Sequence, residues 1–192
     1  MTTATATEQT TPCPLPDHVR VAIVGSGFSG LGMAIGLKQA GRNDFAILER
    51  GPGVGGTWRD NDYPGAACDV PSRLYSFSFA PNPGWTRSFS AQPEILRYLR
   101  DCCERFGVDR HLYSSTTVDR ADWDDEARVW RVRTSRGALT ADVLVSAAGA
   151  LSDPKNPEIP GLDTFTGATF HSAAWKHEHD LAGERVSGSA PW

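Results

Sequence analysis

Two short apolar runs, separated by a helix-like segment, dominate the first fifty residues. Residues 21–24 read Val-Ala-Ile-Val and residues 45–48 read Phe-Ala-Ile-Leu, so neither run has a polar face. Such runs are typical of strands inside a parallel sheet. Between them, residues 29–40 predict a helix that Gly41 would end. The order strand, helix, strand predicts an α/β fold with a Rossmann-like parallel sheet.

Three later patterns extend this picture. Residues 93–106 predict a second helix, because a proline lies in the first turn, a glycine follows, and apolar residues recur on one face. That face comprises Ile95, Leu96, Leu99, Cys103 and Phe106. Residues 74–79 alternate, as a strand or an aromatic wall would.

The segment from 116 to 145 changes to an antiparallel pattern. Residues 129–133 alternate strictly, and turn residues occur at 124–126 and 136–137. Residues 141–149 then predict another buried strand, which ends on small residues. We therefore expect an antiparallel β-meander inserted in a nucleotide-binding core.

A glycine-rich turn follows the first apolar run. Glycines 25, 27 and 30 have the G-x-G-x-x-G spacing. In such a turn Gly25 permits the tight bend, Gly27 lets a pyrophosphate approach the backbone, and Gly30 lets the helix pack closely on the strand. The N-terminus of the helix would then face two phosphates.

A carboxylate ends the second apolar run. Glu49 lies 24 residues after Gly25, near the spacing of about 20 residues at which an acid meets the ribose of an adenine dinucleotide. The alternative is a surface carboxylate after an ordinary βαβ unit. Residues 51–58 and 146–149 are rich in small residues, which predicts further close approaches of the backbone to a bound group.

Composition and charge narrow the possible functions. A net charge of −4 gives no reason to expect nucleic acid or an anionic membrane as partner. No apolar run could span a bilayer, and the N-terminus lacks a signal-peptide pattern. The four cysteines show neither metal-ligand spacing nor a disulfide framework, so a cytoplasmic location is expected. His177 and His179 are interpreted as solvated, and no metal is expected.

From residue 19 to residue 186 the chain resembles the N-terminal part of a class B flavin monooxygenase of the Baeyer–Villiger type. The shared motifs are the turn at 25–30, Glu49–Arg50, Gly55–Trp58, Tyr63–Gly65 with Asp69, and Ser146–Gly149. The most specific is the fingerprint F-x-G-x-x-x-H-x-x-x-W, which matches Phe165, Gly167, His171 and Trp175. Lys176 stands where the family usually has Pro or Asp.

The resemblance implies a noncovalent FAD and, in the complete architecture, NADPH as reductant. Such an enzyme oxidises a ketone with O₂ to an ester or lactone through a C4a-peroxyflavin. The residues that the resemblance and the turn place around the cofactor are Gly25, Gly27, Ser29, Gly30, Glu49, Arg50, Gly55, Gly56, Thr57, Trp58, Asp69, Tyr75, Val118, Ala148 and Gly149.

Three of the implied roles have plain structural alternatives. Asp69 would be an active-site carboxylate near the flavin, or else a cap for the turn before Pro71. Trp58 would border the flavin or belong to the core. His171 would position the linker between two nucleotide domains rather than transfer a proton.

We expect four segments along the chain. These are a disordered leader (1–17), the FAD-binding domain (18–152), a linker with the fingerprint (153–182), and the truncated start of an NADPH domain (183–192). Arg185 and Val186 would begin a strand, but the last six residues do not continue it. We therefore expect a truncated chain that is catalytically incomplete alone, unless a separate chain supplies the NADPH domain.

Two alternatives remain open. One is another flavin-dependent oxidoreductase, such as an N-hydroxylating monooxygenase, which the fingerprint disfavours, or a disulfide reductase. No C-x-x-x-x-C pair follows Glu49, which disfavours the reductase. The other alternative is a non-catalytic FAD-binding module that docks on a separate chain.

Overall fold

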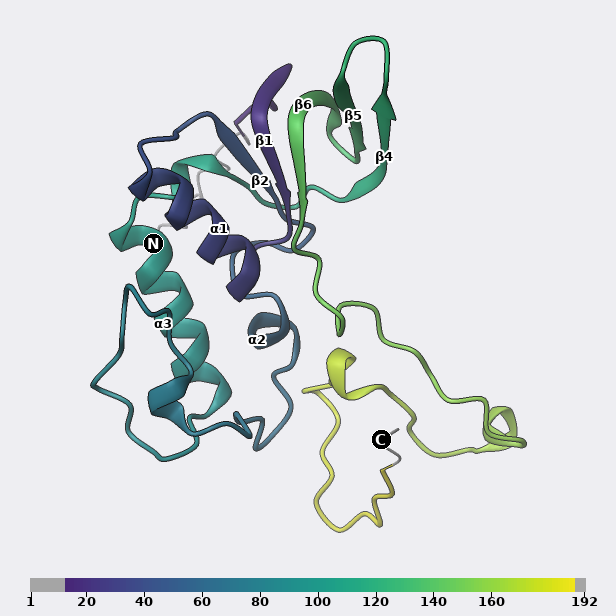
Figure 1. Cartoon of the computed structure of the whole chain (residues 1–192). Coiled ribbons are helices and arrows are strands. Elements are labelled where there is room, and N and C mark those ends of the chain that lie inside the picture. The colour runs from purple at the N-terminus through teal and green to yellow at the C-terminus, as the bar shows by residue number, and fades with distance from the viewer. Residues whose placement is uncertain (1–12, 189–192) are drawn as a thin grey trace, which may run out of the picture.

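The first apolar run forms a central strand of the sheet. In the computed structural model, which describes residues 13–188, β1 (His18–Val24) pairs in parallel with β2 (Phe45–Leu48) and with β6 (Gly137–Ser146). The strand order is β3-β2-β1-β6-β5-β4 (Figure 1). Because β1 has neighbours on both sides, its C-terminal half needs no polar residue. The predicted Rossmann-like α/β fold is confirmed.

The short strand β3 (Leu112–Tyr113) extends the sheet beyond β2. It is parallel to β2, with Leu112 opposite Ile47. This strand could not be predicted from the sequence, because two residues are too few to show an alternating pattern.

Two helices pack on the parallel strands. The helix α1 (Phe28–Gln39) ends at Ala40, and Gly41 follows with φ +72°. The helix α3 (Gln92–Arg105) is followed by Gly107 with φ +61°. Both helices lie within one residue of their predicted starts and ends. One hydrophobic cluster joins them to the strands, and its largest members are Ile23, Leu31, Ile35, Phe45, Ile47, Tyr98 and Leu99.

The buried face of α3 differs slightly from its prediction. Ile95, Leu99 and Cys103 are buried, and Tyr98 and Cys102 complete the buried face. Phe106, one residue past the helix, packs partly buried against the same cluster as predicted, whereas Leu96 is only partly buried. Positions 95, 98, 99, 102 and 103 follow the 3.6-residue period of a helix.

The predicted antiparallel meander is confirmed, and its last strand pairs with strands on both sides. β4 (Val118–Asp124) pairs with β5 (Val129–Thr134), and β5 pairs with β6. β6 is also the strand that returns to β1, with Thr140 opposite His18. A second hydrophobic cluster joins the meander to the parallel strands and includes Val19, Ala22, Leu48, Val132, Leu139 and Ala141.

Two strand predictions need correction. Residues 74–79 form no strand: a 3₁₀ turn covers Ser72–Leu74, and Phe77 and Phe79 stack with ring centroids 4.9 Å apart. This segment is therefore the aromatic wall, since no neighbouring strand pairs along it. The strand expected over 141–149 ends at Ser146 and is only partly buried, with Val143 48% exposed. The helices pack on β1 and β2 and leave this part of β6 exposed (Figure 1).

The two ends of the chain also depart from expectation. Residues 1–12 of the predicted leader and residues 189–192 lie outside the described residues. Within residues 13–17, Leu15 packs against the second cluster and the Asp17 carbonyl accepts a hydrogen bond from Thr140 N, while Cys13 and Pro14 are exposed. Arg185 and Val186 form no strand, and Val186 is 63% exposed. A strand needs a paired neighbour to persist.

No helix within residues 13–188 is long and apolar enough to cross a membrane.

Candidate dinucleotide site

The tight turn between β1 and α1 forms the first part of the candidate site. Gly25 has φ +100°, and a Cβ there would lie 2.5 Å from the carbonyl oxygen of Ala147. A Cβ on Gly30 would lie 2.0 Å from the carbonyl oxygen of Gly25. The packing of the chain itself therefore requires glycine at both positions, as the motif predicts.

Gly27 has no such internal reason to lack a side chain. A Cβ there would meet only the Cα of Gly56, at 3.7 Å, which is ordinary van der Waals contact. Gly56 has φ +51° and comes from the next glycine-rich loop, which the hydrogen bond from Gly55 N to Ser26 O (3.1 Å) holds in place. Two bare backbone segments thus lie close together, as the close approach of a pyrophosphate requires.

The N-terminus of α1 opens beside these glycines. Its N-cap is Gly27, which offers no capping side chain, and its first turn contains no acidic residue. Ser29 lies exposed in that turn. The first N–H groups and the positive end of the helix dipole suit an anion. The donor set therefore fits a diphosphate.

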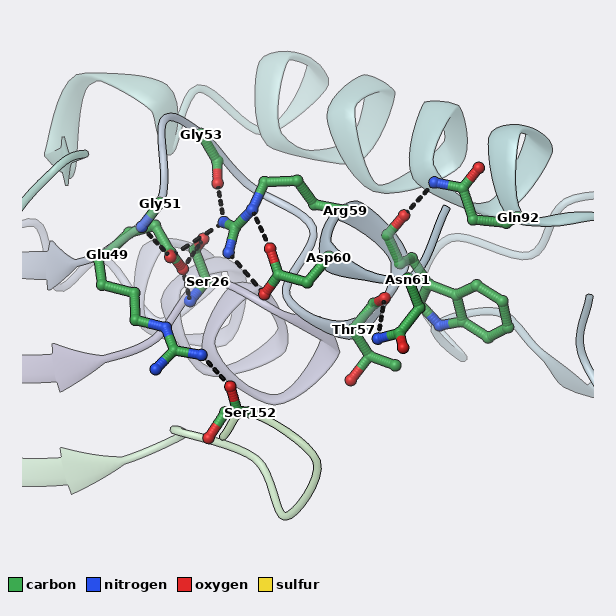
Figure 2. A network of polar contacts seen from close by, with 12 residues as sticks. Ser26, Glu49, Gly51, Gly53, Thr57, Arg59, Asp60, Asn61, Gln92 and Ser152 are labelled. Carbon is green, nitrogen blue, oxygen red and sulfur yellow. Dashed lines mark hydrogen bonds and ion pairs between the residues drawn. The ribbon is translucent and has the colours of Figure 1, made fainter. Parts of the chain in front are cut away.

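Glu49 follows β2 and points into the chain rather than out to solvent. Its side chain is 5% exposed. Oε2 accepts hydrogen bonds from Ser26 N (2.9 Å) and Ser26 Oγ (2.5 Å), and Oε1 accepts one from Gly51 N (2.7 Å) (Figure 2). Burial would raise the pKa of Glu49, but the hydrogen bonds from Ser26 and Gly51 and the charge of Arg59 lower it overall. The carboxylate is therefore held ionised.

Arg59 is the cationic partner of this carboxylate. It lies in the short helix α2 (Thr57–Asp60), and its Nη1 is 2.9 Å from Glu49 Oε1. The same guanidinium donates to the carbonyl oxygen of Gly53 (2.5 Å) and to both carboxylate oxygens of Asp60 (2.7 and 2.9 Å) (Figure 2). Sequence reasoning missed Arg59, because one arginine after a glycine-rich loop looks like any exposed charge.

Arg50 is turned away from Glu49. Its guanidinium contacts Asp153 (2.5 Å) and the carbonyl oxygen of Ser152. A cavity of about 420 Å³ lies between this contact and the glycine loop, and its lining includes Arg50, Gly51, Arg59, Asp60, Thr117, Leu151 and Ser152. The cavity adjoins Glu49 through Gly51 and Arg59, where the ribose was predicted.

An aromatic group borders the other end of the glycine loop. Trp58 Nε1 donates to the Tyr75 hydroxyl (3.0 Å), and Phe28 packs edge-on against Tyr75 with centroids 4.9 Å apart. Burial raises the pKa of Tyr75, the hydrogen bond from Trp58 lowers it, and the nearby Cys68 and Asp69 raise it further. Trp58 is thus both a partly buried packing residue and a neighbour of the glycine turn.

Asp69 is exposed. Within residues 13–188 its carboxylate accepts no hydrogen bond, so it does not cap the turn before Pro71. Its charge acts on the Tyr75 hydroxyl instead.

The remaining residues predicted to bind the cofactor lie in different parts of the domain. The end of β6 lies beside Gly25, since Ala147 N donates to Val24 O (2.9 Å), and Ala148 and Gly149 follow it exposed. Thr57 is exposed at the start of α2. Val118 begins β4 and packs against the second hydrophobic cluster, directly after Thr117, which lines the cavity beside Arg50.

The fingerprint segment is divided between an exposed and a docked half. Phe165 is 62% exposed, and its ring lies over Gly167, where a Cβ would be 2.6 Å away. His171 Nδ1 accepts a hydrogen bond from Ala173 N (3.0 Å), so it caps the following 3₁₀ turn. Trp175 packs against Tyr63, with centroids 6.5 Å apart. His171 therefore has a local positioning role in this structure.

The cysteines and histidines form no redox or metal centre within the described residues. Cys68, Cys102 and Cys103 are buried free thiols and Cys13 is an exposed one. His177, whose side chain is 60% exposed, lies 3.0 Å from Asp62, and the partly exposed His179 lies 3.1 Å from Glu184. No group of three or more potential ligands in the described residues could hold a metal ion.

Comparison with known proteins places this site in a family. The family model described as Pyridine nucleotide-disulphide oxidoreductase matches residues 22–187, which include every part of the glycine-rich site. The chain belongs to this family. Membership agrees with the β1–α1 turn and with the meander that follows the parallel strands.

Individual relatives narrow the assignment within the pyridine nucleotide-disulphide oxidoreductase family. A Baeyer–Villiger monooxygenase of Streptomyces coelicolor is 60% identical over 171 residues, covering 89% of this chain and 33% of that protein. The ε-caprolactone-bound crystal structure of cyclohexanone monooxygenase matches with TM-score 0.79 and 38% identity, covering 88% of this chain and 34% of that one. The structure of OTEMO in complex with FAD and NADP matches with TM-score 0.76 and 32% identity, over 88% and 32% of the two chains.

These findings confirm the resemblance to class B flavin monooxygenases. The chain is homologous to the N-terminal part of Baeyer–Villiger monooxygenases and spans about a third of the length of the relatives it matches. Its α/β core and fingerprint therefore come from a monooxygenase lineage.

Proposed function

We propose that residues 18–152 form the FAD-binding domain of an NADPH- and O₂-dependent Baeyer–Villiger monooxygenase that converts ketones to esters or lactones. One observation carries this proposal. Gly27 and Gly56 present bare backbone to each other at the uncapped N-terminus of α1, and packing within the described residues gives Gly27 no other reason to be glycine. Homology to Baeyer–Villiger monooxygenases supplies the reaction class.

The glycine turn would hold the diphosphate. The N–H groups of the first turn of α1 donate to its oxygens, and the helix dipole favours its negative charge. A side chain at position 27 would take the space that the phosphates need, whereas glycine leaves the backbone accessible.

Glu49 would hold the adenine-side ribose. Its ionised carboxylate is a strong acceptor for the hydroxyl groups, because a hydrogen bond to a charged acceptor is stronger than one between neutral groups. The cavity of about 420 Å³ beside Gly51 and Arg59 gives the ribose an approach to this carboxylate.

The aromatic group and Asp69 would border the flavin ring. When bound, FAD supplies the redox and oxygen-activating chemistry that no side chain of this chain can provide. Phe28, Trp58 and Tyr75 exclude water from one side, and Asp69 supplies an exposed carboxylate close to Tyr75. Asp69 is the residue we assign to the catalytic centre.

The linker would position a second nucleotide domain. Trp175 and His177 attach the end of the fingerprint segment to Tyr63 and Asp62, directly after α2. In this proposal NADPH binds beyond the fingerprint, in the part of the relatives that the 192 residues do not span.

Titration of the purified chain with FAD tests the proposal. We expect flavin fluorescence to be quenched with one FAD bound per chain, and Glu49→Gln to weaken binding by at least about tenfold, through loss of a charge-assisted hydrogen bond. Asp122→Asn is the matched control, because Asp122 lies in an exposed ion pair on β4 and should leave FAD affinity unchanged. A folded wild-type chain that binds no FAD would overturn the proposal.

A further inference from the structure

The Glu49 carboxylate has a donor for each of its acceptor sites. Ser26 N and Ser26 Oγ occupy Oε2, while Gly51 N and Arg59 Nη1 occupy Oε1. A carboxylate has about four lone-pair sites, so these four donors match its acceptor capacity. Three of the donors are neutral, and Arg59 alone carries a charge.

Arg59 is also the charged donor on the accessible side. Ser26 is fully buried, whereas Gly51 and Arg59 line the cavity of about 420 Å³. The four donors already fill the acceptor sites of the carboxylate, so a ribose hydroxyl that approaches through this cavity binds Oε1 only when Arg59 Nη1 gives up that contact. The guanidinium then keeps Gly53 O and Asp60 as partners and remains beside the carboxylate.

The glycine loop is shaped around the same side chain. A Cβ on Gly51 would lie 2.3 Å from Arg59 Cζ, and a Cβ on Gly55 would lie 2.9 Å from Arg59 Cβ. The Arg59 side chain is only 12% exposed and is held at Gly53, Asp60 and Glu49, so it cannot move aside freely. The loop from Gly51 to Gly55 thus wraps closely around Arg59.

We propose that Arg59 is a positioning residue of the FAD site, whose guanidinium keeps the Glu49 carboxylate ionised and aimed at the ribose cavity. This inference rests on the proposed function. Only two other charged groups are relevant: Asp60 partly offsets the charge of Arg59, and Arg50 is engaged by Asp153 instead of Glu49. The hydrogen bonds from Ser26 and Gly51 lower the pKa of Glu49 against its burial, and Arg59 adds the positive charge that these neutral donors lack.

The test is the FAD dissociation constant as a function of pH, from pH 8 to pH 5, for wild type and Arg59→Gln. In the wild type we expect an affinity that changes little over this range. In Arg59→Gln, Glu49 takes up a proton at a higher pH than in the wild type. As the pH falls, the FAD dissociation constant of Arg59→Gln should therefore rise relative to that of the wild type. The final ratio should be about tenfold for each pH unit by which the titration midpoint of Glu49 has risen. A purely structural role would weaken binding by the same factor at every pH.

Two further variants keep the test decisive. Arg59→Lys retains the positive charge but not the bidentate hydrogen-bonding geometry of the guanidinium. The titration midpoint of Glu49 should therefore stay near that of the wild type, while the affinity for FAD falls. Should Arg59→Gln fail to fold by circular dichroism, a raised midpoint in Arg59→Lys would overturn the inference. Arg120→Gln is the matched control, since Arg120 pairs with Asp122 in an exposed ion pair on the meander.

The two proposals fail separately. A folded wild-type chain that binds no FAD at any pH overturns the proposed function, and this inference with it. A wild-type chain that binds FAD, with an Arg59→Gln to wild-type ratio that is constant across pH, overturns the role of Arg59 alone.

Discussion

The Nε2 atom of His177 lies 3.0 Å from Oδ2 of Asp62, which joins the end of the fingerprint segment to the loop after α2. Two residues earlier, Trp175 packs against Tyr63, next to Asp62. The segment after β6 first extends away from the domain, and its later part, with the 3₁₀ turn Ser172–Ala174, returns toward α2 (Figure 1). Both side chains of the polar contact are largely exposed, and exposed polar contacts of this kind contribute only about 0–1 kcal/mol. An aromatic pair adds about 0.5–1.5 kcal/mol beyond the area that it buries.

Trp175→Ala should release the linker. We expect trypsin to cleave after Lys155 several times faster in this variant than in the wild type, since the linker loses its aromatic contact with Tyr63 while the domain stays folded. Glu184→Gln, which removes only the exposed pair with His179, is the control and should leave cleavage unchanged. Equal cleavage rates in wild type and Trp175→Ala would show that the aromatic contact does not hold the linker.

Gly25→Ala and Gly27→Ala should separate folding from binding. At position 25 the positive φ and the 2.5 Å approach to Ala147 O make alanine destabilising by about 2 kcal/mol or more in urea unfolding. At position 27 alanine fits, so stability should change by less than about 1 kcal/mol. FAD affinity of Gly27→Ala should nevertheless fall at least about tenfold, because the new methyl group occupies phosphate space. Unchanged FAD binding in Gly27→Ala would place the phosphates elsewhere.

Trp58→Phe should test the aromatic border. The change removes the indole N–H that donates to Tyr75 but keeps an aromatic ring, so unfolding should become easier by about 0.5–1.5 kcal/mol. We expect the fluorescence of bound flavin to change at the same time, since Trp58 is proposed to lie beside it. Trp123→Phe, on the exposed meander hairpin, is the matched control and should leave the fluorescence of bound flavin unaltered. Flavin fluorescence equal to that of the wild type in Trp58→Phe would assign Trp58 to the core alone.

Burial raises the pKa of the Cys103 thiol to about 11, and the nearby Asp109, Glu104 and Cys102 raise it as well. The folded chain therefore holds this proton more tightly than the unfolded chain does, so the stabilising contribution is present below about pH 9 and is lost between pH 9 and about pH 11. In thiol labelling at pH 8 we expect one fast cysteine, the exposed Cys13, and all four in denaturant. Fast labelling of Cys103 in the folded chain would contradict its burial.

NADPH should not reduce FAD bound to the 192-residue chain. Within the described residues, the β1–α1 turn is the one strand–turn–helix site for a diphosphate, and the proposed FAD occupies it. Anaerobic addition of NADPH should therefore leave the flavin absorbance band unchanged over minutes, while dithionite bleaches it as the positive control. Prompt bleaching by NADPH would reveal a hydride-donor site in this chain.

Sequence reasoning succeeded where a local pattern alone determines the structure. The apolar runs of β1 and β2, the period of α3 and the glycines that end both helices all depend on neighbours within a few residues. The strand predicted as one possibility for residues 74–79 does not form. An alternating pattern is compatible with a strand, but it does not supply a neighbouring strand for pairing. The same limit explains why β3 was missed and why Val143 was expected to be buried.

The glycines of the site and Glu49 were predicted from the sequence, but the charged partners of Glu49 and Arg50 were not. G-x-G-x-x-G determines the turn, since two of its glycines are demanded by steric contacts within the chain. Arg59 contacts Glu49 only because the loop from Gly51 to Gly56 folds back on itself. A contact of this kind leaves no periodic pattern in the sequence, so it could not be predicted. Arg50, expected at the cofactor, lines the same cavity, but its contact with Asp153 lies 103 positions further along the chain and could not be predicted from local sequence.

The pairing of β1 with β6 sets the order in which the domain can be completed during synthesis. His18 lies opposite Thr140, so the two strands are separated by 122 positions along the chain. Until β6 has left the ribosome, β1 has a neighbour on one side only, and its other edge can pair with a foreign strand. Closing so long a loop is slow compared with forming the local β1–α1–β2 unit. The nascent chain therefore passes through a stage in which the glycine turn exists but the strand end beside it does not, and this is the stage at which a chaperone protects it most usefully.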